Sequence, residues 1–389
     1  MVKVLYLAYD GMLDPLGQSQ VLPYLKGLSK RGHRIDILSF EKREKMAETV
    51  SVSGLRADLE AAGIGWVPLV YHKRLSALAT FWDNTRAVAK GWRMAKRADL
   101  LHLRSYALGP ASLVLSKLAT RPLLFDMRGL WVQERIDGGI WSAKTWLGAP
   151  ARRIERWLLR RAERVVTLTK ASVTQVKELG GIDVEKITVI PTCVDLDRFR
   201  VSERQTSRSR LEFCYHGSLG TWYDTERLLK FIKAIRSRGY NFTAFVNDPL
   251  DESARRLLEA GASVLSVAHS DMPSLLQSMD GSVFFIRATP SKIASMPTKL
   301  GESLAVGLPV LTASGVGDVD EILEENQVGL VLDGQDEIEV REVLNDFVEM
   351  IQEPAIKVRC RQVAERHFSL YRGVETYDRV YRQLIETGH

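Results

Sequence analysis

Three basic residues gather around the start of one predicted helix in the C-terminal half of the sequence. The segment 296–312 reads MPTKLGESLAVGLPVLT, which predicts a short helix with Pro297 in its first turn, followed by a strand. Lys299 then lies where backbone N–H groups already carry partial positive charge, and Arg287 and Lys292 lie just upstream. Such a group of cations and N–H donors suits a phosphate or diphosphate. The alternative is a solvated basic loop.

Glu302 follows one turn further along the same helix. It lies four residues after Thr298, whereas a capping box needs a spacing of three, so it is not the usual capping partner. A carboxylate at this position can instead accept hydrogen bonds from ribose hydroxyls. We therefore expect Thr298, Lys299 and Glu302, together with Arg287 and Lys292, to hold a nucleoside diphosphate.

Two glycine-containing loops follow predicted strands. Gly17 lies in the loop after the strand at 2–8, and Gly217 and Ser218 follow the strand at 211–216. Glycine lets a ligand approach the backbone closely, although a G-x-x-G sequence after a strand is often only a tight turn. We expect the backbone N–H groups of both loops to contribute to the same ligand site.

Four polar residues lie at or just beyond predicted strand ends in the N-terminal half: His102, Arg104, Asp126 and Arg128. A single histidine at such a place is more often structural than catalytic. An aspartate and an arginine together, as in the sequence DMRG, are less easily explained by packing alone. We expect Asp126 and Arg128 to be catalytic, and His102 and Arg104 to bind an acceptor molecule.

The elements that position these residues follow the order strand, loop, helix, strand. The pattern runs through the first half, and then restarts after the polar segment 201–210, a predicted linker. Strands are predicted at 2–8, 35–40, 101–106, 122–127, 164–169, 211–216, 242–246, 262–267, 281–286, 310–312 and 329–332. The fold class is therefore α/β, with two doubly wound parallel sheets. Ligands of such folds bind at the carboxyl ends of strands and between domains.

The composition agrees with a folded, two-domain chain. The chain has 389 residues, of which 45% are hydrophobic and 26% are charged, and its net charge of +6 favours acidic partners. Its three cysteines show no metal-ligand or disulfide spacing, which favours a reducing cytoplasm, and no Asp-x-Asp metal motif stands out. No signal peptide or membrane-spanning run is recognisable, so we expect any membrane contact to be peripheral.

Two helical segments combine basic and aromatic residues. In the first, the spacing predicts cations on one face of the helix and apolar residues on the opposite face; in the second, arginines lie near Trp146 and Trp157. The residues are Arg86, Lys90, Arg93 and Arg97 with Phe81, Val88, Trp92 and Ala95, and then Arg152, Arg153, Arg156, Arg160 and Arg161. Such helices can lie on an anionic membrane, for example the inner face of the cell membrane. The alternative is a helix packed on its own sheet with a solvated basic face. A nucleic-acid partner is not expected, because exposed aromatics do not alternate with the basic residues as a single-strand platform requires.

Taken together, the motifs resemble the family 4 glycosyltransferases, which are retaining enzymes of the GT-B fold. The resemblance rests on the loop at Gly17, the segments RVVTLTKAS and VIPTCVDLDRF, the sequence HGSLG and, most specifically, PTKLGESLAVGLPVLT. It implies an acceptor domain at 1–190, a nucleotide-sugar domain at 201–365, and a C-terminal helix at 366–389 that crosses back to the first domain.

The resemblance implies transfer of a sugar from a nucleoside-diphosphate donor to a glycan or lipid-linked glycan, in surface polysaccharide or glycolipid synthesis, without a metal or other cofactor. Glu302 matches the second glutamate of the family pair, whereas Ala294 replaces the first. The cations that usually grip the diphosphate are replaced by Ser218 and Tyr223, and the family histidine near the sugar by Arg128. Two alternatives stay open: a GT-B sugar-nucleotide epimerase, and a non-catalytic membrane-surface partner of a transferase.

Overall fold

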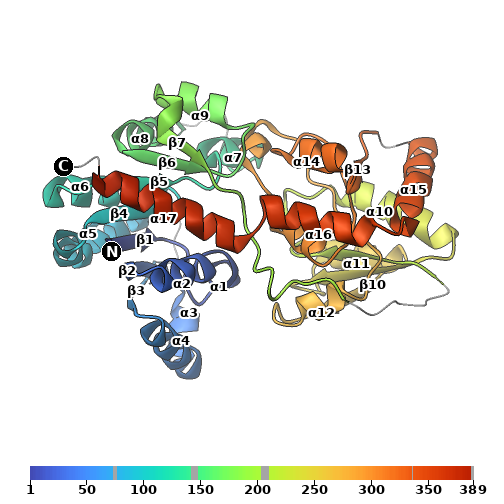
Figure 1. Cartoon of the computed structure of the whole chain (residues 1–389), viewed down its shortest axis with the longest axis horizontal. Coiled ribbons are helices and arrows are strands. Elements are labelled where there is room, and N and C mark those ends of the chain that lie inside the picture. The colour runs from blue at the N-terminus through green and yellow to red at the C-terminus, as the bar shows by residue number, and fades with distance from the viewer. Residues whose placement is uncertain (73–76, 142–147, 203–209, 335, 387–389) are drawn as a thin grey trace. The chain divides into compact units, whose positions relative to one another are not determined.

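The computed structural model describes residues 1–72, 77–141, 148–202, 210–334 and 336–386. The chain forms two compact units, Met1–Pro191 with Leu370–His389, and Thr192–Ser369, called unit 1 and unit 2 below (Figure 1). Most of the expected linker and Trp146 lie outside the described residues.

Unit 1 is built on a parallel sheet of seven strands in the order β3-β2-β1-β4-β5-β6-β7. Its strands are β1 (Lys3–Ala8), β2 (Arg34–Glu41), β3 (Ile64–Val70), β4 (Leu100–Arg104), β5 (Leu123–Asp126), β6 (Arg164–Thr167) and β7 (Ile187–Val189). The central strands are buried almost throughout, as expected for parallel strands covered by helices on both faces.

The helices of unit 1 form two layers. They are α1 (Pro15–Gln20), α2 (Leu22–Lys30), α3 (Arg43–Ala47), α4 (Thr49–Ala61), α5 (Ala77–Arg97), α6 (Gly109–Ala119), α7 (Trp131–Asp137), α8 (Gly148–Arg161), α9 (Val173–Gly180), the 3-10 turn η1 (Val184–Lys186) and α17 (Leu370–Glu386). Helix α17 packs on α2 and β4, and both helices lie on the face of the sheet turned to the viewer in Figure 1. Helix α6 packs between α5 and α8.

Unit 2 contains a parallel sheet of six strands in the order β10-β9-β8-β11-β12-β13. The strands are β8 (Glu212–His216), β9 (Asn241–Val246), β10 (Ser263–Ser266), β11 (Gly281–Val283), β12 (Val310–Thr312) and β13 (Gly329–Val331). The helices are α10 (Thr225–Ser237), α11 (Glu252–Glu259), α12 (Met272–Leu276), the 3-10 turn η2 (Pro290–Ala294), α13 (Thr298–Ala305), α14 (Val319–Asn326), α15 (Glu337–Gln352) and α16 (Ile356–His367). The predicted α/β class with two doubly wound sheets is confirmed.

Two local predictions differ from the structure. Gly17, expected in the loop after the first strand, lies within the short helix α1, and α1 is separated from α2 at Val21 because Pro23 lies in the first turn of α2 and cannot continue a preceding helix. Pro297 is the residue before α13 rather than part of its first turn, since its backbone is extended (ψ 126°). Lys299 is consequently the second residue of the helix.

The strand orders place the switch points of the two sheets between β1 and β4 in unit 1 and between β8 and β11 in unit 2. At a switch point the loops after adjacent strands diverge, which leaves room for a ligand at the carboxyl ends. No helix within the described ranges is both long and apolar enough to span a membrane.

Candidate functional site

Lys299 lies at the switch point of unit 2, with its ammonium enclosed by aromatic rings. Its Nζ is 4.1 Å from the ring centre of Tyr215, 4.0 Å from that of Tyr223 and 5.5 Å from that of Phe284. These rings come from the end of β8, the loop after it and the residue after β11. The lysine is 5% exposed and, with Lys292, is one of the two buried lysines among the described residues.

The Lys299 Nζ donates no hydrogen bond to an oxygen in the part of the chain that the structure describes. Burial lowers the pKa of Lys299 well below its ordinary value, although Glu302 opposes the shift. Cation–π contacts contribute about 0.5–2 kcal/mol each and offset only part of the several kcal/mol that burying an ion without a hydrogen-bond partner costs. A buried cation at the start of α13, without an oxygen partner among the described residues, is therefore better explained by a ligand than by stability.

Glu302 and His216 form the polar side of this site. Nε2 of His216, the last residue of β8, is 3.2 Å from Oε2 of Glu302, and both side chains are buried. Burial lowers the pKa of His216, so the neutral imidazole is favoured, while its Nδ1 has no partner among the described residues. Lys299 and Glu302 thus lie one turn apart on α13, and the imidazole of His216 from β8 contacts the Glu302 carboxylate.

The loop 217–224 is fixed to the segment after β11 by main-chain hydrogen bonds. The N–H of Asp224 donates to Phe285 (2.9 Å), and the N–H of Arg287 donates to Trp222 (2.9 Å). Gly217 has a positive φ of 113°, and a Cβ there would lie 3.3 Å from the Lys299 Nζ. The positive φ therefore favours glycine at this position, and any side chain there would also press on the end of Lys299.

The other residues predicted for this site lie around the same loop. The Nζ of Lys292, in η2, is 3.8 Å from the Trp222 ring centre, and that lysine is buried. Arg287 and Ser218 are exposed, and Thr298 is half-buried at the start of α13. The structure therefore brings the predicted residues of unit 2 to one switch point. Ala294 is buried in η2 and presents no polar group.

In unit 1 the carboxylate of Asp126 is the centre of a buried ionic cluster at the switch point. Arg104 Nη1 and Arg128 Nη1 lie 3.6 and 3.8 Å from its oxygens, and His102 Nε2 lies 3.8 Å away. Arg104 also approaches Asp10 at 3.5 Å. Burial opposes ionisation of Asp126, but the surrounding Arg128, His102 and Arg104 outweigh it and lower the pKa of the carboxyl.

Two tyrosines of α17 complete this cluster. The hydroxyl of Tyr377 donates to Asp126 Oδ2 at 3.0 Å, and Tyr381 hydrogen-bonds with His102 Nδ1 at 2.7 Å. His102, Arg104 and Asp126 are all buried. The structure therefore shows them joining the C-terminal helix to β4 and β5.

Arg128 is the most accessible member of the cluster, and its backbone is unusual. Its φ is 58°, a left-handed value that non-glycine residues adopt rarely, and such strain concentrates at functional sites. The cavity bounded by Tyr6, Gln20, Arg104, Asp126 and Arg128 measures about 10 Å³, which is room for about one water. A sugar does not fit inside the cluster, so a substrate can meet it only along its outer edge at Arg128.

Gly17 has a packing role in the structure. It lies buried inside α1, where a Cβ would come within 2.2 Å of the Gly11 carbonyl oxygen and 2.7 Å of the Met12 Cα. The helix can approach the loop after β1 only because this position has no side chain.

The aromatic residues around Lys299 and the tyrosines of α17 were missed by sequence reasoning. Their partners are distant in sequence, so no local spacing reveals them. His216 had a detectable signal, because it ends a buried strand and directly precedes a glycine.

Comparison with known proteins finds similarity to glycosyltransferases. Residues 17–193 match the family model described as "Glycosyl transferase 4-like domain". Glycogen synthase of Mycobacterium tuberculosis, in two strains, is 23% identical over 262 residues. This match covers 64% of the present chain and 61% of the relative, so the chain spans less than two thirds of the relative's length.

Solved structures share the fold over nearly the whole chain. A glycosyltransferase from Rickettsia africae has a TM-score of 0.75 at 12% identity, covering 99% of this chain and 98% of that one. Anabaena HepE in complex with UDP has a TM-score of 0.74 at 17% identity, covering 98% and 100%, and it has also been solved with UDP-glucose. Sucrose-phosphate synthase from Thermosynechococcus elongatus has a TM-score of 0.72 at 12% identity, covering 100% of both chains. With its two parallel sheets, this chain has the GT-B fold of these structures, and its N-terminal segment 17–193 matches a glycosyl transferase 4-like domain.

Proposed function

We propose that this enzyme transfers a hexose from a nucleoside-diphosphate donor to a glycan or lipid-linked glycan in surface polysaccharide or glycolipid synthesis. Unit 2 is the donor domain, and unit 1 with α17 is the acceptor domain. The enzyme acts in the cytoplasm, peripherally on the inner face of the membrane. The HepE structures with UDP and UDP-glucose support the choice of a nucleotide-sugar donor.

The observation that carries this proposal is the buried Lys299 ammonium at the unit 2 switch point, which has no oxygen partner among the described residues. Tyr223 lies near the sequence position where related enzymes are expected to carry a diphosphate-binding cation, and here its ring contacts Lys299 instead. The cation is thus supplied from α13 rather than from the loop after β8. Thr298, Arg287, Lys292 and the N–H groups near Gly217 and Ser218 complete the diphosphate site, and Glu302 binds the ribose.

In the proposed reaction, the bond between the anomeric carbon and the diphosphate oxygen breaks, and the acceptor hydroxyl oxygen bonds to the same face of that carbon. The hydroxyl proton passes to the leaving diphosphate, so no protein base is needed. Lys299 stabilises the negative charge that develops on the diphosphate. Arg128, oriented by Asp126, acts at the sugar, while His102 and Arg104 support the acceptor side.

Isothermal titration with a panel of UDP-, GDP- and ADP-sugars tests the donor site, using the wild type and Lys299→Met. Removing one charge-assisted contact should weaken diphosphate binding about tenfold or more, while binding of the nucleoside alone should change little. Lys233→Met, an exposed lysine of α10, is the matched control. Unchanged donor affinity in Lys299→Met would remove this lysine from the site.

Product analysis separates the proposal from its rivals. Donor and a glycan acceptor together should give a longer glycan with retained anomeric configuration. A new sugar nucleotide formed without any acceptor would indicate an epimerase instead. Absence of turnover with every donor, with vesicle binding preserved, would indicate a non-catalytic partner.

A further inference from the structure

Helix α5 exposes cations and apolar side chains but no carboxylate. Its basic residues are Arg86, Lys90, Arg93, Lys96 and Arg97. The one acidic residue in its sequence is Asp83, whose side chain is 0% exposed. All exposed charges of this helix are therefore positive, which is uncommon for a helix that only faces water.

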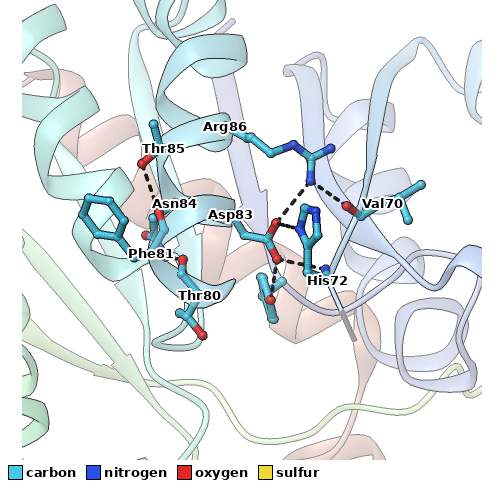
Figure 2. A network of polar contacts seen from close by, with 9 residues as sticks. Val70, His72, Thr80, Phe81, Asp83, Asn84, Thr85 and Arg86 are labelled. Atoms are coloured by element: carbon cyan, nitrogen blue, oxygen red, sulfur yellow. Dashed lines mark hydrogen bonds and ion pairs between the residues drawn. The ribbon is translucent and has the colours of Figure 1, made fainter. Parts of the chain in front are cut away.

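Asp83 is held inside by a network at the carboxyl edge of the unit 1 sheet (Figure 2). It accepts hydrogen bonds from the Tyr9 hydroxyl (2.9 Å) and Arg86 Nη1 (3.1 Å), and its Oδ1 lies 2.8 Å from His72 Nδ1. Arg86 Nη1 also donates to the carbonyl of Val70, the last residue of β3, at 2.6 Å. The network fixes the start of α5 to the end of the sheet.

The first turns of α5, held in this way, present three large apolar side chains to solvent. Leu78 is 80% exposed, Phe81 72% and Trp82 54%. The sequence pattern grouped Phe81 with Ala95 on one apolar face, yet Ala95 is buried and Phe81 is not. The apolar residues at the start of α5 therefore lack a partner among the described residues.

Helix α8 repeats the arrangement on the same side of unit 1. It carries exposed arginines at 152, 153, 156, 160 and 161, while Glu155, its one acidic residue, is buried. Ile154 and Trp157 are partly exposed. Helix α6, packed between α5 and α8, contains Lys117 and no acidic residue. In both α5 and α8, the single acidic side chain is thus buried, whereas basic side chains are exposed.

We propose that this surface, the α5–α6–α8 face, docks on an anionic lipid bilayer, with Leu78, Phe81 and Trp82 inserted at the boundary between headgroups and acyl chains. The inference rests on the membrane location within the proposed function and assigns it a surface. Aromatic and aliphatic side chains beside exposed cations are the combination that interfacial helices use on anionic membranes. A folded acidic protein would neutralise the cations but would not require three protruding apolar groups at one helix end.

Leu78, Phe81 and Trp82 lie where docking on a membrane would bring the acceptor site close to the lipid. The first turn of α5 lies at the carboxyl edge of the unit 1 sheet, because α5 follows β3 and is tied to its last residue. Substrates of parallel α/β sheets bind at that edge. Insertion there would bring the acceptor domain to the headgroups of a lipid-linked glycan.

Co-sedimentation with vesicles tests this surface without any catalytic readout. The full chain should bind vesicles of phosphatidylglycerol and phosphatidylcholine, and should bind phosphatidylcholine alone much more weakly. The double variant Phe81→Ser/Trp82→Ser should lose about tenfold or more in partition coefficient, given the apolar area removed. Ile338→Ser, which changes a residue of α15 that is 71% exposed, is the matched control and should bind as the wild type does.

Charge and insertion are tested separately. Lys90→Gln/Arg93→Gln should weaken binding and reduce its salt dependence, whereas the control Lys233→Gln/Arg255→Gln should not. Brominated lipids should quench part of the tryptophan fluorescence of the wild type and less of it in Trp82→Phe. Equal binding to both vesicle types, or unchanged binding of Phe81→Ser/Trp82→Ser, would overturn the proposal.

The outcome is independent of the donor site. Titration of UDP against the same variants in solution, without lipid, reports unit 2 alone, so loss of vesicle binding with intact UDP binding identifies the surface. Retention of the chain on polyanionic RNA or on an acidic protein with no vesicle binding would also contradict a lipid partner.

Discussion

The Lys299 ammonium lies 4.0 Å from the centre of the Tyr223 ring, and no oxygen among the described residues hydrogen-bonds to it. A ring face attracts a cation but does not replace the hydration that burial removes. The ammonium is therefore poorly stabilised in the free protein, and an anionic ligand at the switch point would stabilise it. Removing the lysine should consequently raise the stability of the free protein but weaken ligand binding.

Lys299→Met should stabilise the ligand-free protein while it impairs donor binding. Replacing a buried, uncompensated charge by an apolar chain of similar length should raise the free energy of unfolding by about 1–3 kcal/mol. Denaturant unfolding without ligand measures this change. A loss of stability comparable to that of a core cavity would show that the ammonium is satisfied in the free protein.

Donor binding should take up protons at alkaline pH. Burial lowers the pKa of Lys299 in the free protein, and a diphosphate beside it should raise that pKa again. Between the lowered pKa and about 10.5 the free site is neutral and the occupied site is charged, so affinity should fall as pH rises. Titration calorimetry in buffers of different ionisation enthalpy measures the proton uptake. Lys299→Met should abolish it.

Lys299 should also make the free energy of unfolding of the ligand-free protein depend on pH. Over that pH range the unfolded chain binds a proton that the folded chain lacks, so the free energy of unfolding should rise with pH. Lys299→Met should show a smaller rise. Identical slopes for the two proteins would place the folded pKa near its ordinary value.

The tyrosines of α17 should be essential to unit 1 although they lie near the end of the sequence. Tyr381→Phe removes the partner of the buried His102 Nδ1 and should cost about 1–3 kcal/mol of unfolding free energy, the usual penalty for a buried polar atom left unpaired. Tyr377→Phe should act similarly through Asp126.

Tyr371→Phe is the matched control for these two changes. Its side chain is exposed on the same helix, and its ring keeps the contact with Arg31 after the substitution. Chemical unfolding of the three variants makes the comparison. Equal effects for Tyr371 and Tyr381 would mean that the hydroxyl groups do not hold α17 in place.

Glu155 should make unit 1 less stable as pH rises towards neutrality. Burial raises the pKa of this carboxyl from 4.5 to about 7, against the opposing hydrogen bond of Tyr106 and the charge of Arg152. The folded state therefore holds a proton that the unfolded state releases between these values, and stability should fall by about 1–3 kcal/mol across the interval.

Glu155→Gln should flatten this dependence, because the amide resembles the protonated acid and does not titrate. Thermal unfolding of both proteins from pH 4.5 to 8 measures it. If the two curves remain parallel, the folded pKa of Glu155 is close to its unfolded value.

The sequence by itself determined the buried parallel strands and the strand ends near which the candidate site residues lie. The continuous apolar runs predicted buried parallel strands, and β1, β8 and β12 appear where those runs lie. The position of Lys299 beside Glu302 at the start of one helix followed from local spacing alone. Local rules sufficed because hydrophobic runs, prolines and glycines act on their own segment of chain.

Tertiary structure alone decided which groups meet these residues. Tyr215, Tyr223 and Phe284 come from separate segments, and only the adjacency of β8 and β11 brings them around one ammonium. In the same way, α17 reaches Asp126 across more than half the chain. Whether a charge is solvated or buried depends on packing between distant segments, and that is why the sequence located Lys299 but could not show that its ammonium is buried among aromatic rings.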